Sequence, residues 1–475
     1  MNPYANLIGG RWITSTAIIS NISPSDTNDV VGEYSMATPN DVAEAGIAAR
    51  ASLKSWSQST AQARAEILLT VARELEARRV DLGELLAREE GKTRADGIGE
   101  VARAAQVFQF FAGEALRLQG ERAPSIRPGV EVEITREPVG VVGIITPWNF
   151  PIAIPAWKIA PALAFGNTVI FKPAELTPAS AWALTDILHR AGTPPGVVNL
   201  VMGRGSQLGE AIIHEVDAMS FTGSVPTGRR IAARAIESMV KLQLEMGGKN
   251  PLIVLDDADL DIAVDCAVNG AFYQTGQRCT ATSRIIVQKG IHDRFVASVV
   301  ERMRSLRVGH ALDSATDIGP VVDQRQFDSN LQYLEVGEGE GAARIGGQVL
   351  QASTPGFYLQ PALFTETNNS MRINREEIFG PIASIIPVDS FDEALDVAND
   401  TAFGLSAGIC TTSLKYARHF QANIQSGLAM VNLPTAGLDF HVPFGGRKAS
   451  SYGPREQGRY AAEFYTTVKT SYVRP

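Results

Sequence analysis

Four short apolar runs separated by helical stretches constrain the fold of this chain more than any other feature. They are the segments 141–145, 168–171, 197–201 and 218–221. Strands that alternate with helices predict a parallel sheet of nucleotide-binding type. A second series at 251–255, 285–287 and 383–386 predicts another α/β unit. A chain of 475 residues is too long for one compact core, so two or more domains are expected.

The segments outside these two series follow other patterns. Residues 41–119 carry apolar side chains at helical spacing, and Asp41 is the expected N-cap of the first helix. Charged and apolar side chains alternate from Glu131 to Arg136, which predicts a ribbon with one exposed face. The segment 465–473 is a further expected strand.

Composition narrows the classes of partner and location. The net charge is −8 without basic runs, which argues against nucleic acid and anionic membranes as partners. The most apolar stretch, 141–171, is interrupted by prolines and is not expected to span a membrane. Met1 to Leu7 does not resemble a signal peptide. The cysteines Cys266, Cys279 and Cys410 have no disulfide or metal-type spacing, so we expect a cytoplasmic protein without a metal site.

Cys279 is the candidate nucleophile. Gly276 allows a tight turn before it, Arg278 places a cation beside the thiol, and small residues follow. A thiol in a cramped, electropositive turn is expected to ionise readily. The alternative is that Cys279 acts as a small buried hydrophobic residue, as most free cysteines in cytosolic enzymes do.

Glu245 is the candidate general base. It lies among apolar neighbours just before Gly247 and Gly248. Apolar surroundings raise the pKa of a carboxyl, which suits it to accept a proton near neutral pH. A surface carboxylate at a helix end is the alternative interpretation.

The motifs Glu-Met-Gly-Gly-Lys at 245–249 and Gly-Gln-Arg-Cys at 276–279 resemble the NAD(P)-dependent aldehyde dehydrogenase superfamily, and the resemblance covers essentially the whole chain. It implies an α/β fold with a Rossmann-type cofactor domain, an α/β catalytic domain and a small β oligomerisation ribbon. The implied bounds are 1–120 and 140–247 for the dinucleotide-binding domain, 248–451 for the catalytic domain, and 121–139 and 452–475 for the ribbon. A homodimer or homotetramer is the implied assembly.

The resemblance also implies the reaction. The Cys279 thiolate attacks an aldehyde, a hydride leaves the thiohemiacetal for the nicotinamide, and water activated by Glu245 hydrolyses the thioester. The turn 146–151 contains Asn149, whose amide the resemblance assigns to the oxyanion hole. Lys158 matches a family lysine near the proton path, although an ordinary ion pair is an equally good interpretation.

Lys172 and Glu175 follow the second strand, where open α/β sheets bind ligands. A carboxylate there accepts hydrogen bonds from both ribose hydroxyls and repels a 2′-phosphate, which favours NAD over NADP and leaves NADP open. The helix start at Gly223 and Ser224 suits a pyrophosphate. Further cofactor contacts implied by the resemblance are Thr146, Pro147, Trp148, Gly205 and Phe221, with Glu377 on the nicotinamide ribose and Phe379 against the ring.

Matched positions imply a substrate tunnel lined by Phe150, Ile154, Trp157, Tyr273 and, in its outer loop, Phe440. Semialdehyde members that bind a carboxylate often carry Arg where this chain has Tyr273, and the nearest cation here is Arg278. This disfavours a succinate semialdehyde specialist. The motifs at 276–284, 443–448 and 451–458 resemble the branch of 2-oxoglutarate semialdehyde (2,5-dioxopentanoate) dehydrogenases. Aromatic and broad-range aldehyde dehydrogenases look similar and stay open as alternatives.

Two rival functions are disfavoured by residues that are present. A CoA-acylating dehydrogenase typically lacks the general-base glutamate, whereas Glu245 is here. An inactive structural or binding homologue should have lost Cys279, Glu245 or Asn149, and the sequence keeps all three.

Overall fold

A computed structural model describes residues 3–475, and an eight-stranded sheet forms the centre of its first half. The strand order is β19-β11-β10-β7-β8-β9-β1-β2, and the strands from β11 to β9 run parallel. Their bounds are β1 (Asn6–Ile8), β2 (Arg11–Ile13), β7 (Val141–Ile145), β8 (Thr168–Lys172), β9 (Val198–Leu200), β10 (Ala218–Thr222), β11 (Lys241–Glu245) and β19 (Ser451–Tyr452). The predicted parallel α/β sheet is therefore confirmed.

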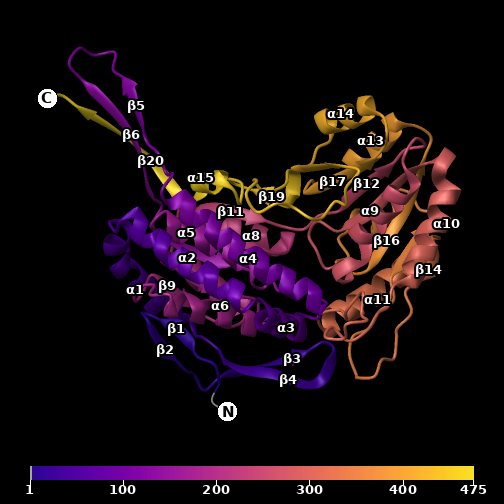
Figure 1. Cartoon of the computed structure of the whole chain (residues 1–475), viewed down its shortest axis with the longest axis horizontal. Helices are drawn as coiled ribbons and strands as arrows, with labels where there is room; N and C mark the ends of the chain where they lie inside the picture. Colours follow the sequence, from indigo (N-terminus) through magenta and orange to yellow (C-terminus); the bar gives the residue numbers. More distant parts are fainter. Residues whose placement is uncertain (1–2) are drawn as a thin grey trace.

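Helices cover both faces of this sheet (Figure 1). They are α1 (Pro39–Ser57), α2 (Ala61–Ala77), α3 (Arg79–Glu90), α4 (Arg94–Ala115), α5 (Ala153–Ala164), α6 (Pro178–Arg190), α7 (Gly205–Glu215) and α8 (Val225–Glu237). Successive side chains of β7 point to opposite faces, as in any strand. Val142 and Ile144 pack in the core formed with α2 to α6, whereas Val141 and Ile145 pack in the core formed with α1, α7 and α8.

The first helix begins before the predicted cap. Thr38 is the N-cap of α1, because its hydroxyl accepts from the Asp41 N–H at 3.3 Å. The Asp41 carboxylate accepts in return from the Thr38 N–H at 2.7 Å. Asp41 thus closes a capping box from the first turn and is not the N-cap itself, and Pro39 fits the first turn because it needs no N–H partner there.

A seven-stranded sheet forms the second half, with the order β14-β15-β16-β13-β12-β17-β18. Its bounds are β12 (Asn250–Val254), β13 (Thr282–Gln288), β14 (Ala343–Gly346), β15 (Ala362–Thr365), β16 (Ile382–Val388), β17 (Ser406–Cys410) and β18 (Leu428–Val431). The accompanying helices are α9 (Leu260–Phe272), α10 (Lys289–Ser305), α11 (Gln324–Gly339), α12 (Arg372–Arg375), α13 (Phe391–Asn399) and α14 (Leu414–Asn423). None of the helices within residues 3–475 is both long and apolar enough to cross a membrane.

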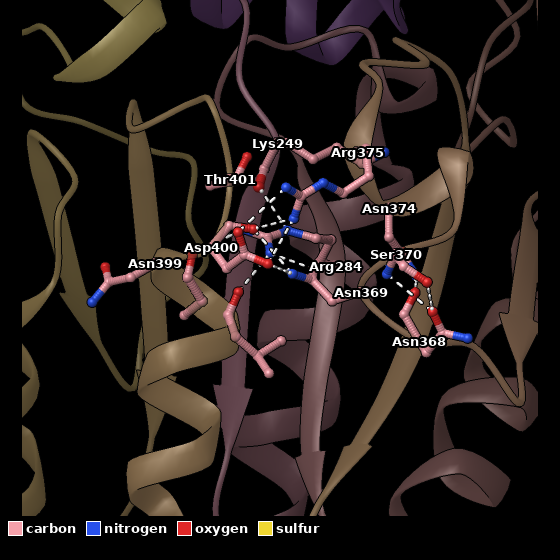
Figure 2. Close-up of polar contacts among 12 residues, drawn as sticks. Lys249, Arg284, Asn368, Asn369, Ser370, Asn374, Arg375, Asn399, Asp400 and Thr401 are labelled. Atoms are coloured by element: carbon pink, nitrogen blue, oxygen red, sulfur yellow. Dashed lines mark hydrogen bonds and ion pairs between the residues drawn. The ribbon is translucent and has the colours of Figure 1, made fainter.

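Arg284 of β13 fixes the middle of this second sheet (Figure 2). The side chain is fully buried, and its Nε donates to the main-chain oxygen of Lys249 at 3.1 Å. Its other nitrogens donate to Asn369 Oδ1 at 3.0 Å and to the main-chain oxygens of Val397 and Ala398 at 2.8 and 2.9 Å. A buried cation with these partners ties the turn before β12 to the loop that carries Asn369 and to the C-terminal end of α13.

A three-stranded ribbon projects from the body at the upper left of Figure 1. It consists of β5 (Glu121–Pro124), β6 (Glu131–Pro138) and β20 (Thr466–Val473), and β20 pairs with the whole of β6. The predicted start of its C-terminal part at 452 differs from the structure. Residues 451–465 pack on the first sheet instead, through β19 and α15 (Ala462–Tyr465), because Phe464 and Tyr465 are buried in its core.

A hairpin of β3 (Ile18–Ser23) and β4 (Asp26–Ser35) joins the two halves. The main-chain oxygen of Ser25 accepts from the hydroxyls of Tyr358 and Thr354, both at 2.6 Å. These contacts connect the N-terminal strands to the far end of the second sheet.

Candidate active site

Four parallel strands of the first sheet end at one edge, and a predicted site residue lies at or just after each end. Asn149 follows β7, Lys172 ends β8, Gly223 follows β10 and Glu245 ends β11. The carboxyl ends of parallel strands are where open α/β sheets bind ligands. The sheet therefore brings together four segments that are far apart in the sequence.

Cys279 lies in the loop between α9 and β13, after a turn with left-handed backbone. Gln274, Thr275 and Gly276 have φ values of 53°, 58° and 63°. A Cβ on Gly276 would lie 2.1 Å from the main-chain oxygen of Gly380, so a larger residue does not fit there. The main-chain oxygen of Cys279 accepts from Asn250 Nδ2 at 2.8 Å. The tight turn predicted from Gly276 is confirmed, and the cysteine backbone is fixed.

The prediction that the Cys279 thiol has electropositive surroundings is wrong. Burial raises the pKa of the Cys279 thiol to about 12, and the carboxylates of Glu377 and Glu245 add to this rise. The Arg278 guanidinium is engaged elsewhere, since it donates to the main-chain oxygens of Asn269 and of Gly270, the latter at 2.9 Å. The described residues therefore favour the neutral thiol in the free enzyme.

Two cavities meet at Cys279. The first has a volume of about 330 Å³ and is lined by residues of α4, α5, the cysteine loop and the segment 436–444, with Gln457. The second has a volume of about 300 Å³ and is lined by the 147–149 turn, residues 222–224, 246–247 and 377–379, with three residues of α11. Cys279 and Ile154 line both cavities. A group bound on either side thus has access to the thiol.

Asn149 lies against the cysteine loop. Its Nδ2 donates to the main-chain oxygen of Gln277 at 2.9 Å. An amide nitrogen carries two hydrogens, so the second can donate to another acceptor. The main-chain oxygen of Asn149 accepts from the buried Lys92 ammonium at 2.6 Å, and Glu100 Oε2 accepts from the same ammonium at 2.7 Å. Sequence reasoning missed both Lys92 and Glu100, which lack any motif of their own.

Glu245 is buried at the end of β11 and belongs to a polar cluster beside the cavities. Ser451 Oγ donates to its Oε2 at 2.5 Å. Burial, with the nearby Glu456 carboxylate, raises the pKa of Glu245 well above its ordinary value, as predicted. Lys158 pairs with Glu456 and donates to Ser220 Oγ at 2.8 Å. The ion-pair interpretation of Lys158 is confirmed, and the lysine lies in the cluster around Glu245, while its place on the proton path stays a prediction.

The second cavity is lined by aromatic and polar groups. Trp148 and Phe379 contact each other edge to face in its wall, with ring centroids 5.4 Å apart. Glu377 Oε1 accepts from the Gly248 N–H at 2.9 Å, and burial raises the pKa of Glu377 to about 7. A Cβ on Gly247 would lie 2.0 Å from Glu377 Oε2. Thr222 Oγ1 is buried without a partner among the described residues. These groups fit a nicotinamide ribose.

The residues predicted for the adenosine end lie farther along the sheet edge, outside the lining of the second cavity. Lys172 Nζ lies 3.9 Å from Glu175 Oε2, which accepts from the Gly205 N–H at 3.3 Å. Glu175 is 43% exposed and so remains accessible to a ligand. The main chain of Thr146 donates to Lys172, while Phe221 packs in the core and its ring limits the space at Gly223. Ser224 Oγ donates to Thr227 Oγ1 at 3.1 Å.

Comparison with known proteins accounts for this arrangement. The aldehyde dehydrogenase family model matches residues 12–471. The chain belongs to the aldehyde dehydrogenase family. It is 42% identical to the alpha-ketoglutaric semialdehyde dehydrogenase of Bacillus subtilis, covering 100% of this chain and 99% of that one. It is 41% identical to the 2,5-dioxopentanoate dehydrogenase of Saccharolobus solfataricus, covering 99% of each. The structure of betaine aldehyde dehydrogenase from Staphylococcus aureus with NAD+ has a TM-score of 0.97 at 34% identity, covering 100% of this chain and 95% of that one.

Two residues predicted for the tunnel of this aldehyde dehydrogenase do not line the first cavity. Phe150, Ile154, Trp157 and Arg278 do, but Tyr273 and Phe440 do not. Tyr273 is the C-cap of α9 and packs with that helix on the core of the second sheet, because the left-handed turn begins only after it. Phe440 packs on Phe110, with ring centroids 6.0 Å apart. Gln274 takes the place predicted for Tyr273.

Several cavity residues were missed by sequence reasoning. They are Asp96, Glu100 and Arg103 of α4 with Leu438 and Gln457. The helical spacing of α4 was evident, yet its residues were interpreted as packing only. The polar residues on a buried face of α4 are the signal that would have found them.

Proposed function

We propose that this aldehyde dehydrogenase oxidises a semialdehyde with a distal carboxylate, 2-oxoglutarate semialdehyde being the first candidate, to the corresponding acid. NAD+ is the proposed acceptor of the hydride. The observation that carries the proposal is the position of Cys279 at the meeting of two cavities, one for each reactant. The relatives named for this semialdehyde support the choice of substrate.

The proposed chemistry starts at the thiol. The Cys279 thiol gives its proton to the nearby Glu245 carboxylate, the thiolate adds to the aldehyde carbon, and the oxygen becomes an alkoxide within reach of the second hydrogen of Asn149 Nδ2. Lys92 and Gln277 hold that amide turn from both sides, so the donor is in position before charge develops. NAD+ supplies a hydride acceptor when bound, and loss of hydride from the thiohemiacetal leaves a thioester on Cys279.

Hydrolysis of the thioester requires a base, and we assign this step to Glu245. A buried carboxyl with a raised pKa accepts a proton from water more readily than an ordinary one. Ser451, Lys158 and Glu456 lie around it and offer a route for the proton away from the site. Water attack on the acyl carbon then releases the acid and returns the thiol.

The cofactor preference is proposed from Glu175. A half-exposed carboxylate beside Lys172 and the start of α7 accepts hydrogen bonds from ribose hydroxyls and repels a 2′-phosphate. The residues 1–120 and 140–247 would carry this cofactor, and 248–451 the nucleophile. We also propose a homodimer or homotetramer that covers the exposed apolar side chains of β20, such as Val468 and Tyr472.

A second candidate substrate is an aromatic or quaternary ammonium aldehyde. The first cavity is lined by Phe150, Trp157 and Phe444, and the last two rings are 5.7 Å apart. Aromatic faces attract quaternary ammonium groups. The structural relationship to a betaine aldehyde dehydrogenase favours the same candidate.

An aldehyde panel decides between these candidates. NADH formation by the purified enzyme is measured with 2-oxoglutarate semialdehyde, succinate semialdehyde, betaine aldehyde, benzaldehyde and pentanal, each with NAD+ and NADP+. The proposal expects kcat/KM for the oxo-acid to exceed the others by about tenfold, equivalent to about 1.4 kcal/mol of transition-state binding. A preference for betaine aldehyde or benzaldehyde would replace it with the second candidate.

A further inference from the structure

The first cavity contains four charged residues, two of each sign. They are Asp96, Glu100, Arg103 and Arg278. A charged group in a cavity either has partners in the protein or is available to a ligand, because leaving it without either is costly. The hydrogen bonds of each side chain therefore show which of them can recognise a substrate.

Three of the four already have partners. Glu100 accepts from Lys92 and from the N–H groups of Ile152 and Ala153 at 2.9 and 3.0 Å. Asp96 accepts from Thr93 Oγ1 at 2.7 Å and from Gln274 Nε2 at 3.2 Å.

Arg278 has partners as well, in the main-chain oxygens of Asn269 and Gly270. It is half-buried beside the cysteine loop, and these two bonds tie it to the end of α9. The Arg278 guanidinium is therefore less available to a substrate carboxylate.

Arg103 of α4 is the exception. Its Nε is buried without a hydrogen-bond partner, as is the Nε of Arg278, but among residues 3–475 the Arg103 guanidinium also lacks the main-chain acceptors that bind Arg278 and lacks an ion pair with any carboxylate. Asp439, the acidic group that acts on it from the neighbouring loop, is exposed and does not contact it within ion-pair distance. The guanidinium carbon lies 5.7 Å from the centre of the Phe440 ring, which limits its movement on one side.

The geometry points to Arg103 as the specificity-determining residue that binds the distal carboxylate of the aldehyde substrate. This inference rests on the proposed function, since it names the group that recognises the proposed substrate class. A guanidinium binds a carboxylate with two parallel hydrogen bonds. The adjacent Phe440 ring restricts the orientation of the Arg103 guanidinium. The remaining lining beside Cys279 contains Phe150, Ile154 and Trp157, which suits the carbon chain between carboxylate and aldehyde.

The test compares an acid with a neutral aldehyde of equal carbon number, 2-oxoglutarate semialdehyde and pentanal. Arg103→Met should lower kcat/KM for the acid by about 30-fold or more, mainly through KM, as expected for lost charged hydrogen bonds. Pentanal oxidation should change by less than about 3-fold. Arg103→Lys keeps the charge but loses the planar guanidinium that forms two parallel hydrogen bonds. Its kcat/KM for the acid should therefore lie between those of the wild type and Arg103→Met, with no change for pentanal.

A binding measurement supports the kinetic one. Glutarate should inhibit pentanal oxidation competitively in the wild type, and Arg103→Met should weaken that inhibition by about tenfold or more. Arg117→Met, which removes an exposed arginine just after α4, is the matched control and should leave both aldehydes and glutarate unaffected.

Each other outcome overturns the inference in a recognisable way. Equal losses on both aldehydes would mean that Arg103 shapes the cavity and does not read the carboxylate. An unchanged acid preference in Arg103→Met would remove Arg103 and leave the proposed function standing. A wild type that does not prefer the acid over pentanal would overturn the proposed substrate class and the role of Arg103 together.

Discussion

The Lys92 ammonium donates to the main-chain oxygen of Asn149 at 2.6 Å and is buried with Glu100 and Glu90, at 2.7 and 3.9 Å. A single buried cation thus connects the start of α4 to the turn that carries the candidate oxyanion donor. Its loss would leave two carboxylates uncompensated and the turn without its support.

Lys92→Met should therefore lower both stability and turnover. The expected loss of stability is about 3 kcal/mol, typical of a broken buried ion pair. The expected loss of kcat is about 100-fold, because a misplaced donor stabilises the alkoxide poorly. Thermal unfolding and steady-state kinetics measure the two effects. The double variant Lys92→Met/Glu100→Gln should recover part of the stability but not the turnover. A kcat of Lys92→Met within about 3-fold of the wild-type value would contradict the positioning role of Lys92.

The Cys279 thiol should be unreactive at neutral pH in the free enzyme. Its pKa is raised to about 12 by burial and carboxylates, so the alkylation rate with iodoacetamide should increase about tenfold per pH unit between pH 7 and 9. NAD+ brings a positive ring and should accelerate alkylation by about tenfold or more at pH 7. Peptide mapping identifies the modified residue. Cys266 and Cys410 serve as internal controls because both are buried in the second core, and a pH-independent rate at Cys279 would show that it is already ionised.

Glu245→Gln should form the acyl-enzyme but hydrolyse it slowly. A burst of NADH followed by turnover reduced about 100-fold or more is expected in rapid-mixing experiments. In the wild type, the hydrolysis rate should rise with pH as the raised pKa of Glu245 is crossed, and the variant should lose this pH dependence. Full steady-state turnover in Glu245→Gln would assign the base to another residue.

The same raised pKa has a consequence for stability. When the pKa of a carboxyl is higher in the folded than in the unfolded state, the group contributes its full stabilisation at a pH below the unfolded-state pKa. This stabilisation is lost as the pH rises through the folded-state pKa. Glu245→Gln should therefore gain Tm relative to wild type as the pH increases from 5 to 9. Glu338→Gln, at an exposed carboxylate, is the control, and a constant difference between wild type and Glu245→Gln at all pH values would exclude a raised pKa.

Glu175→Ser should change the choice of cofactor. Removing a carboxylate that repels a 2′-phosphate should raise the NADP:NAD ratio of kcat/KM by about tenfold or more. Glu210→Ser, on the exposed surface of α7, is the matched control. An unchanged ratio in Glu175→Ser would place the ribose hydroxyls elsewhere.

A strand or a site residue could be predicted from the sequence where its signal lies in a short segment of the chain. The strands β7 to β10, β12, β13 and β16 were evident, because a run such as 141–145 must be buried wherever it lies, whereas β11, β14, β15, β17 and β18 were not predicted. Cys279, Glu245 and Asn149 stood out because each lies in a short motif next to a strand end or a glycine turn. Glu456, by contrast, does not stand out within the motif 451–458. Its pairing with Lys158, 298 positions away in the sequence, has no local signature.

The sequence by itself determined the alternation of strands and helices, the family, and the residue types at the nucleophile and the base, since these depend on local patterns. Only the tertiary structure decided which charges in the first cavity have partners. The sequence singled out Arg278 and not Arg103, yet Arg278 is bound to main-chain oxygens and Arg103 is not. The tertiary structure also moved Tyr273 out of the cavity and Gln274 into it, because a left-handed turn reverses side-chain directions that spacing alone cannot give.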